Sequence, residues 1–87
     1  MMEITIYSKN NCVFCNKAKH LVKSLGYEYT EKKMEEFESP QAMLEDIGKH
    51  VRTMPQIKID GKLIGGYNQL VEHFADMGKV NFKGEII

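Results

Sequence analysis

The sequence predicts an α/β fold with the element order β-α-β-α-β-β-α, formed as a single domain over residues 1–87. Segments of alternating β-branched and aromatic residues are interleaved with segments whose apolar residues recur at helical spacing. A chain of 87 residues is too short for two independently folded cores. Its 43% hydrophobic and 28% charged residues are typical of a globular domain and argue against disorder.

The first half of the chain predicts a β-α-β unit. Residues 3–8 alternate and favour a strand, and residues 9–11 have the composition of a turn. Apolar residues at helical spacing over residues 14–25 predict a helix, with Gly26 as its C-cap. Residues 27–33 alternate again and predict a second strand. A right-handed crossover makes these two strands parallel.

The middle of the chain predicts a helix followed by a hairpin. Ser39-Pro40 places an N-cap before a proline at the first helical position, so a helix is expected through about residue 49. Residues 56–59 and 62–64 are joined by Asp60-Gly61, which is the turn sequence of a two-residue hairpin. The two hairpin strands are therefore expected to be antiparallel.

The last part of the chain predicts a third helix. Gly65-Gly66 ends the hairpin, and Asn68 is expected to cap a helix that ends near Gly78. Residues 80–87 are compatible with a short extra strand or with a docked arm. The sequence leaves this choice open.

The overall charge gives no sign of a nucleic-acid or membrane partner. Twelve basic and twelve acidic residues cancel, and no apolar stretch is long enough to span a bilayer. The first residues lack the layout of a signal peptide, and two cysteines are too few for a secreted disulfide scaffold. We therefore expect a cytoplasmic monomer (in the host cytoplasm if the source is viral).

Charges are unevenly distributed along the chain. Residues 9–23 hold four lysines and no acid, and this stretch surrounds both cysteines. Nearby cations stabilise a thiolate, so these lysines favour a reactive cysteine. Seven acids in residues 28–46 most simply form a solvated face, although a docking face for a protein substrate is an alternative.

The most informative motif is Cys12-Val13-Phe14-Cys15. Cysteines three residues apart at a helix start lie about one turn apart, which is close enough for a disulfide. Cys12 is expected where free N–H groups and the helix dipole favour an anion, which lowers the pKa of a thiol. Cys15, inside the first turn, is expected to be more shielded. One sulfur can then attack and the other resolve.

Other uses of the cysteine pair fit the sequence less well. A structural zinc site needs four ligands, and His20, His50 and His73 are not spaced as a second ligand pair. Covalent haem attachment needs a histidine where this chain has Asn16. A purely structural disulfide would close a loop too short to stabilise the fold much. A redox pair, with no metal, is the favoured interpretation.

Thr53-Met54-Pro55 is the second motif. Pro55 precedes an expected strand, where a proline can simply mark the strand start. Alternatively, a cis Met54-Pro55 bond beside the cysteines would present the Met54 backbone to an extended peptide ligand. Met54-Pro55 alone is a weak signal, but the cysteine pair in the same chain makes it informative.

Three blocks in this order resemble the glutaredoxins, small proteins of the thioredoxin fold. They are Ile6-Tyr7-Ser8-Lys9 before the cysteine motif, Arg52-Thr53-Met54-Pro55-Gln56, and Ile64-Gly65-Gly66-Tyr67-Asn68-Gln69-Leu70. The short length and the forms of the last two blocks are most similar to the bacteriophage glutaredoxins, also called phage thioredoxins. The resemblance implies a four-stranded mixed sheet flanked by three helices, with the third strand antiparallel to the first.

The resemblance also implies a glutathione site. Cys12 would be the nucleophile and Cys15 the resolving thiol, with Phe14 as an apolar wall. Lys9 and Arg52 would meet the glycyl carboxylate, and the Met54 backbone beside cis-Pro55, with Thr53, would pair with the cysteinyl unit. Backbone N–H groups of Asn68 and Gln69 would hold the γ-glutamyl carboxylate, as helix N-termini do for anions.

Two departures from the family pattern bear on that site. The family usually has proline and tyrosine where this chain has Val13 and Phe14, which affects the redox potential. Many members carry aspartate where this chain has Gln69, and a neutral amide pairs more weakly with the γ-glutamyl ammonium than a carboxylate does.

The implied function is a glutathione-dependent thiol–disulfide oxidoreductase, an enzyme that reduces protein disulfides and glutathione mixed disulfides. Ribonucleotide reductase is a candidate electron acceptor by the same resemblance. Two alternatives remain: a redoxin reduced by thioredoxin reductase, and an iron–sulfur or metal-binding adaptor.

Overall fold

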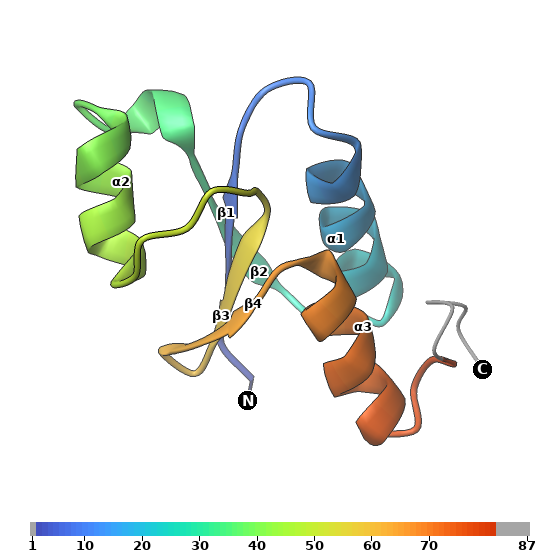
Figure 1. Ribbon diagram of the computed structural model, residues 1–87. Coiled ribbons are helices and arrows are strands. Elements are labelled where there is room, and N and C mark those ends of the chain that lie inside the picture. The colour runs from blue at the N-terminus through green and yellow to red at the C-terminus, as the bar shows by residue number, and fades with distance from the viewer. Residues whose placement is uncertain (1, 82–87) are drawn as a thin grey trace.

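Four strands form one mixed sheet in the computed structural model, which describes residues 2–81. They are β1 (Ile4–Ser8), β2 (Tyr29–Lys33), β3 (Gln56–Ile59) and β4 (Lys62–Gly65), in the order β2-β1-β3-β4 (Figure 1). β1 pairs in parallel with β2 and antiparallel with β3, and β3 pairs antiparallel with β4. The mixed sheet, with its third strand antiparallel to the first, is confirmed.

Three α-helices flank the sheet. α1 (Val13–Ser24) and α3 (Tyr67–Asp76) cover one face, and α2 (Pro40–Ile47) lies on the other (Figure 1). This confirms the order β-α-β-α-β-β-α. A short 3-10 helix, η1 (Met34–Glu36), follows β2 and is not expected from the sequence. Within residues 2–81, no helix has the length and apolar character needed to cross a membrane.

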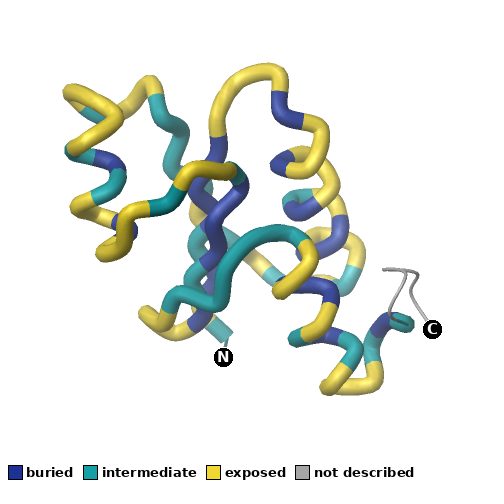
Figure 2. Tube along the Cα trace, viewed as in Figure 1, coloured by how far each residue is buried: buried dark blue, intermediate teal, exposed yellow. Residues whose placement is uncertain are grey.

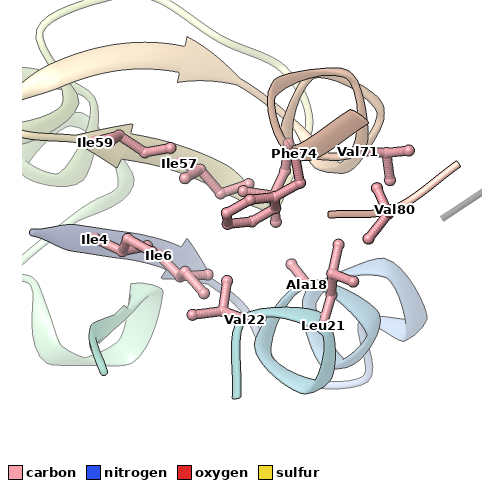
Figure 3. Close-up of a cluster of buried hydrophobic side chains, with 11 residues drawn as sticks. Ile4, Ile6, Ala18, Leu21, Val22, Ile57, Ile59, Val71, Phe74 and Val80 are labelled. Atoms are coloured by element: carbon pink, nitrogen blue, oxygen red, sulfur yellow. The ribbon is translucent and has the colours of Figure 1, made fainter. Parts of the chain in front are cut away.

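The larger core lies between the sheet and the α1–α3 layer. β1 and β3 are buried along most of their length, whereas half of the α2 residues are exposed (Figure 2). The ring of Phe74, which is 0% exposed, lies among side chains from both helices and both strands (Figure 3). The other members of this cluster are Ile4, Ile6, Ala18, Leu21, Val22, Ile57, Ile59, Leu70, Val71 and Val80.

A smaller cluster on the other face attaches α2 to the sheet. Tyr7 of β1 is buried with Met43 and Ile47 of α2, and partly buried side chains, among them Met54, pack against them. The Tyr7 hydroxyl donates a hydrogen bond to Asp46 Oδ2 at 2.7 Å. Burial, reinforced by this bond to a carboxylate, raises the pKa of Tyr7 above its usual range. Through Met54, this cluster adjoins the Thr53-Met54-Pro55 motif.

Local turn and cap chemistry explains most element boundaries. Ser39 Oγ accepts a hydrogen bond from the Ala42 N–H at 3.1 Å, which confirms the predicted N-cap. Asp60 and Gly61 have φ of 53° and 81°, the pair of positive angles of a type I′ hairpin turn. α2 ends at Ile47, earlier than expected, because Gly48 adopts the left-handed conformation that terminates a helix.

The start of α3 differs from the sequence-based expectation. Gly66 is the N-cap, so Asn68 is the second helical residue and its predicted capping role is wrong. Gln69 Oε1 accepts a hydrogen bond from the Gly66 N–H at 2.9 Å, so this backbone donor has a partner without the Asn68 side chain. At the other end of the molecule, Val80 is buried in the larger core. Residues 82–87 of the expected strand or arm lie outside the described residues.

Candidate active site

The two cysteines lie at the N-terminal end of α1. Cys12 is its N-cap, Cys15 lies in its first turn, and a disulfide joins them across a Cα–Cα distance of 5.2 Å. Cys12 Sγ accepts a hydrogen bond from the Cys15 N–H at 3.1 Å. Cys15 is 1% exposed and Cys12 is 8% exposed. As predicted, Cys15 is the more enclosed sulfur, and Cys12 occupies the position where a helix N-terminus stabilises a thiolate.

Apolar side chains surround the disulfide. Val13 and Phe14, between the cysteines, are 67% and 53% exposed, although both are hydrophobic. The Phe14 ring lies 5.9 Å from the ring of Tyr67 at the start of α3, and Lys17 Nζ lies 5.2 Å from the Phe14 centroid. An exposed apolar rim beside a reactive group is typical of a binding surface.

The backbone of Met54 faces the cysteines from the other side. The Met54–Pro55 peptide bond is cis, and the Met54 carbonyl oxygen lies 3.7 Å from Cys12 Sγ. Gln56, itself 5% exposed, donates from Nε2 to the Thr53 carbonyl at 2.8 Å, which holds this loop in place. The predicted cis proline beside the cysteine pair is confirmed.

A groove of about 510 Å³ extends from this loop to the start of α3. Six side chains assigned to the site from the sequence line it together: Phe14, Thr53, Met54, Pro55, Asn68 and Gln69. Lys9 and Arg52, also assigned to the site, are exposed and do not line the groove. Among the described residues, the rest of the lining is Lys49, Val51, Gln56, Ile64, Gly65, Gly66 and Tyr67.

Tyr67 and Lys49 line the groove but were not assigned to the site from the sequence. Tyr67 belongs to the Gly-Gly-Tyr block that supports the family resemblance, so the sequence contained its signal. Lys49 lies just beyond α2, and its place in the groove depends on the path of the chain between α2 and β3. No local pattern marks such a residue.

A polar cluster connects the active-site helix to the sheet. The Glu31 carboxylate on β2 accepts hydrogen bonds from Ser8 Oγ at 2.6 Å and from Lys19 Nζ at 2.8 Å. Partial burial favours the neutral carboxyl, but the bonds from Lys19 and Ser8 outweigh it and hold the pKa of Glu31 below its usual value. Ser8 is the last residue of β1, directly before the loop that leads to Cys12.

A second groove, of about 560 Å³, lies along α1 and is lined partly by Val13, Lys17, His20 and Tyr67. His20 is exposed there. Met54, whose carbonyl oxygen lies 3.7 Å from Cys12 Sγ, lines the 510 Å³ groove and not this one, so we assign the chemistry to the 510 Å³ groove. Within residues 2–81, no three side chains of His, Cys, Asp or Glu are grouped to hold a metal ion.

Comparison with known proteins identifies the family. The glutaredoxin family model matches residues 4–64. Glutaredoxin 3 of Escherichia coli (strain K12) is 34% identical over 71 residues, covering 80% of this chain and 83% of that protein. Glutaredoxin-C4 of Arabidopsis thaliana is 32% identical over 74 residues, covering 83% of this chain and 55% of that protein. The chain thus spans about half the length of this plant relative.

Solved structures support the same fold. The structure of a buckwheat glutaredoxin–glutathione complex superposes with a TM-score of 0.71 at 29% identity, covering 85% of this chain and 69% of that chain. The predicted thioredoxin fold is confirmed, whereas the closer likeness to bacteriophage members stays a prediction. The chain belongs to the glutaredoxin family of thiol–disulfide oxidoreductases, with Cys12 and Cys15 as its redox pair.

Proposed function

We propose that this chain is a glutathione-dependent oxidoreductase that reduces protein disulfides and glutathione mixed disulfides. The observation that carries the proposal is the groove that begins at the Met54 backbone, 3.7 Å from Cys12 Sγ, and ends at the N-terminus of α3. A tripeptide with its sulfur at Cys12 and a carboxylate at that helix end would fill it. The buckwheat relative was solved with glutathione, which supports this choice of ligand.

The proposed reaction proceeds by two thiol–disulfide exchanges. The Cys12 thiolate attacks one sulfur of the substrate disulfide, forms a mixed disulfide and expels the other substrate sulfur as a thiolate. Cys15, after losing its proton, attacks Cys12 Sγ and releases the second substrate thiolate. The substrate gains two electrons, and the Cys12–Cys15 disulfide holds the oxidising equivalents. Two glutathione thiolates then reverse these exchanges and leave as glutathione disulfide.

Glutathione would be held mainly through its backbone and its carboxylates. The Met54 backbone, with Thr53 and Pro55, would pair with the cysteinyl unit as an added strand. The N–H groups of Asn68 and Gln69, which have no partner within the helix, would bind the γ-glutamyl carboxylate. Lys49 lies in the groove and is a candidate for the glycyl carboxylate, together with the exposed Lys9 and Arg52.

The proposed physiological setting rests on the composition of the chain and on the family resemblance. We propose that residues 1–87 act as one monomeric domain in the cytoplasm. By the same resemblance, the disulfide of ribonucleotide reductase is the candidate protein substrate. Thioredoxin reductase is the alternative electron donor, and the assay below separates it from glutathione.

The test is reduction of a small glutathione mixed disulfide, coupled to glutathione reductase and NADPH. We expect activity in the wild type and loss of at least about a hundred-fold in Cys12→Ser, because the nucleophile is gone. Cys15→Ser should retain activity on glutathione mixed disulfides and lose it on intramolecular protein disulfides. Wild-type activity only when thioredoxin reductase replaces glutathione would contradict the proposed donor. Visible absorbance of protein purified under reducing conditions would point instead to a cluster-binding adaptor.

A further inference from the structure

The groove of about 560 Å³ along α1, called the α1 groove below, takes no part in the function proposed above. Tyr67, at the start of α3, is one of its described lining residues. The others recur every three or four residues and so share one face of α1: Val13, Asn16, Lys17, His20, Leu21 and Ser24. The α1 groove therefore extends along the helix from the end that holds the cysteines.

The lining of the α1 groove combines apolar surface with positive charge. Val13 is 67% exposed, Leu21 is buried and Tyr67 is half-buried. Lys17 and His20 are the basic side chains among the described lining residues, and none of these residues is aspartate or glutamate. α1 itself contains no acid, and neither of the two ion pairs within residues 2–81 uses Lys17. A bulky apolar side chain next to a carboxylate complements this surface.

The α1 groove adjoins the redox pair. Val13 directly follows Cys12 in the chain, and Tyr67 lines the 510 Å³ groove as well. The Phe14 ring, 5.9 Å from the Tyr67 ring, lines only the 510 Å³ groove, so the two rings lie where the grooves meet. A polypeptide that brings an internal cysteine to Cys12 has chain on both sides of that cysteine. One arm can follow the 510 Å³ groove while the other passes Val13 into the α1 groove.

We propose that the α1 groove binds the arm of a protein substrate next to its reactive cysteine, an arm that carries a bulky apolar side chain and a carboxylate. The inference rests on the function proposed above and names a class of protein substrate. The helix from Val13 to His20 is about 10 Å long, which is the reach of about three extended residues. The carboxylate therefore belongs about three residues from the cysteine. Docking of the arm makes and breaks no covalent bond, and the exchange at Cys12 is unchanged.

Mixed disulfides of one fluorescent thiol test the role of the carboxylate. Two acetylated peptide amides carry the arm in opposite directions, Cys-Gly-Phe-Glu and Glu-Phe-Gly-Cys, and each has a partner with glutamine in place of glutamate. Pre-reduced protein releases the fluorescent thiol in a stopped-flow instrument, which gives a second-order rate constant. In at least one direction, the wild type should react about three- to five-fold faster with the glutamate peptide, as expected for an exposed ion pair. Equal rates in both directions would overturn the inference.

Lys17→Glu reverses the charge of the lysine in the α1 groove. The glutamate peptide should then react no faster than its glutamine partner. Lys23→Glu is the matched control, because Lys23 is exposed on the same helix and lines neither groove. It makes the same change of charge and should keep at least half of the wild-type ratio. The ratio of two peptides within one protein cancels any change in the reactivity of Cys12. A ratio that survives Lys17→Glu, or that both variants abolish equally, would contradict docking in this groove.

NMR of a covalent complex locates the arm without a rate measurement. In Cys15→Ser the mixed disulfide at Cys12 is not resolved, so the glutamate peptide or glutathione stays attached there. The peptide should shift the amide signals of His20 and Ser24, and glutathione should leave them unchanged. Peptide-induced shifts confined to the 510 Å³ groove would refute the inference and leave the proposed function intact. If a glutathione mixed disulfide reacts no faster with the wild type than with Cys12→Ser, the proposed function itself fails.

Discussion

The Glu31 carboxylate connects three elements next to the redox site. One of its oxygens accepts bonds from Ser8 at the end of β1 and from Lys19 on α1, while Glu31 itself belongs to β2. The Lys19 and Glu31 side chains are 23% and 22% exposed, so solvent screens the pair only in part. These two bonds have their full strength only when the Glu31 carboxylate is ionised. The free energy of unfolding therefore depends on pH through Glu31.

Glu31→Gln should lower the free energy of unfolding by about 1 kcal/mol at pH 7, the upper range for a partly exposed ion pair. The folded-state pKa of Glu31 is lowered, so its stabilisation is present above the unfolded value of about 4.3 and is lost as pH falls through the folded value. Urea titrations at pH 7 and pH 3 should show a difference between wild type and variant that shrinks at pH 3. A difference that grows at pH 3 would contradict this assignment.

At the residue scale, the sequence predicts those positions whose chemistry is local. Cys12 at a helix start and the cis proline beside it follow from the residues themselves and from their motif context. The residue type of Asn68 favours a helix cap, but the cap position depends on the preceding turn. There the Gly66 N–H donates a hydrogen bond to the Gln69 side chain. Lys49 reaches the groove only through the tertiary path of the chain, which no local pattern encodes.

Among the elements, α2 depends on few attachments. Tyr7 donates to Asp46 Oδ2, Lys32 Nζ lies 3.0 Å from the same oxygen, and Lys58 Nζ donates to the Asp46 carbonyl at 2.8 Å. Both lysines also lie 5.7 Å from the Tyr7 ring centroid. Tyr7 is thus the centre of the contact between α2 and the sheet, and the same cluster includes Met54 of the site.

Tyr7→Phe should cost about 1 kcal/mol of stability, because it removes one hydrogen bond while keeping the buried ring. The Tyr7 bond is the main cause of the lowered pKa of Asp46, with Lys32 second, so the variant should raise that pKa toward its ordinary value. NMR titration of the Asp46 carboxyl and amide exchange in α2 are the measurements. Tyr27→Phe is the control, because the half-buried Tyr27 ring stacks on Phe74. It should change neither the pKa of Asp46 nor the amide exchange in α2. An unchanged Asp46 titration in Tyr7→Phe would refute the coupling.

Element boundaries were predictable where a cap or a tight turn sets them, as at Ser39 and at Asp60-Gly61. They were less predictable where alternation fades gradually: β2 begins at Tyr29, two residues later than expected. η1 has no sequence signal of its own. The Glu36 carboxylate accepts a hydrogen bond from the Lys33 N–H at 2.7 Å and so caps the start of η1. Asn10, in the loop before Cys12, donates a hydrogen bond to the Glu35 carboxylate.

At the scale of the whole molecule, stability and recognition are assigned to different surfaces. The larger core fills the space between the sheet and the α1–α3 layer, and Phe74 lies at its centre (Figure 3). Phe14, at the other end of that layer, is 53% exposed and lines the groove. An 87-residue domain buries a smaller share of its surface than a larger one and has little stability in reserve.

A pair of phenylalanine truncations should separate these two roles. Phe74→Ala leaves a cavity in the core and should lower the free energy of unfolding by about 3–5 kcal/mol, a large part of the total for a domain of this size. Phe14→Ala removes a side chain that is largely in solvent, so stability should stay within about 0.5 kcal/mol of the wild type. Its reaction with glutathione mixed disulfides should nevertheless slow several-fold, because the apolar wall beside the sulfurs is lost. Urea unfolding and the assay coupled to glutathione reductase measure the two effects. Equal destabilisation by both substitutions would mean that Phe14 is part of the core, and the division between the stabilising core and the recognition surface would not hold.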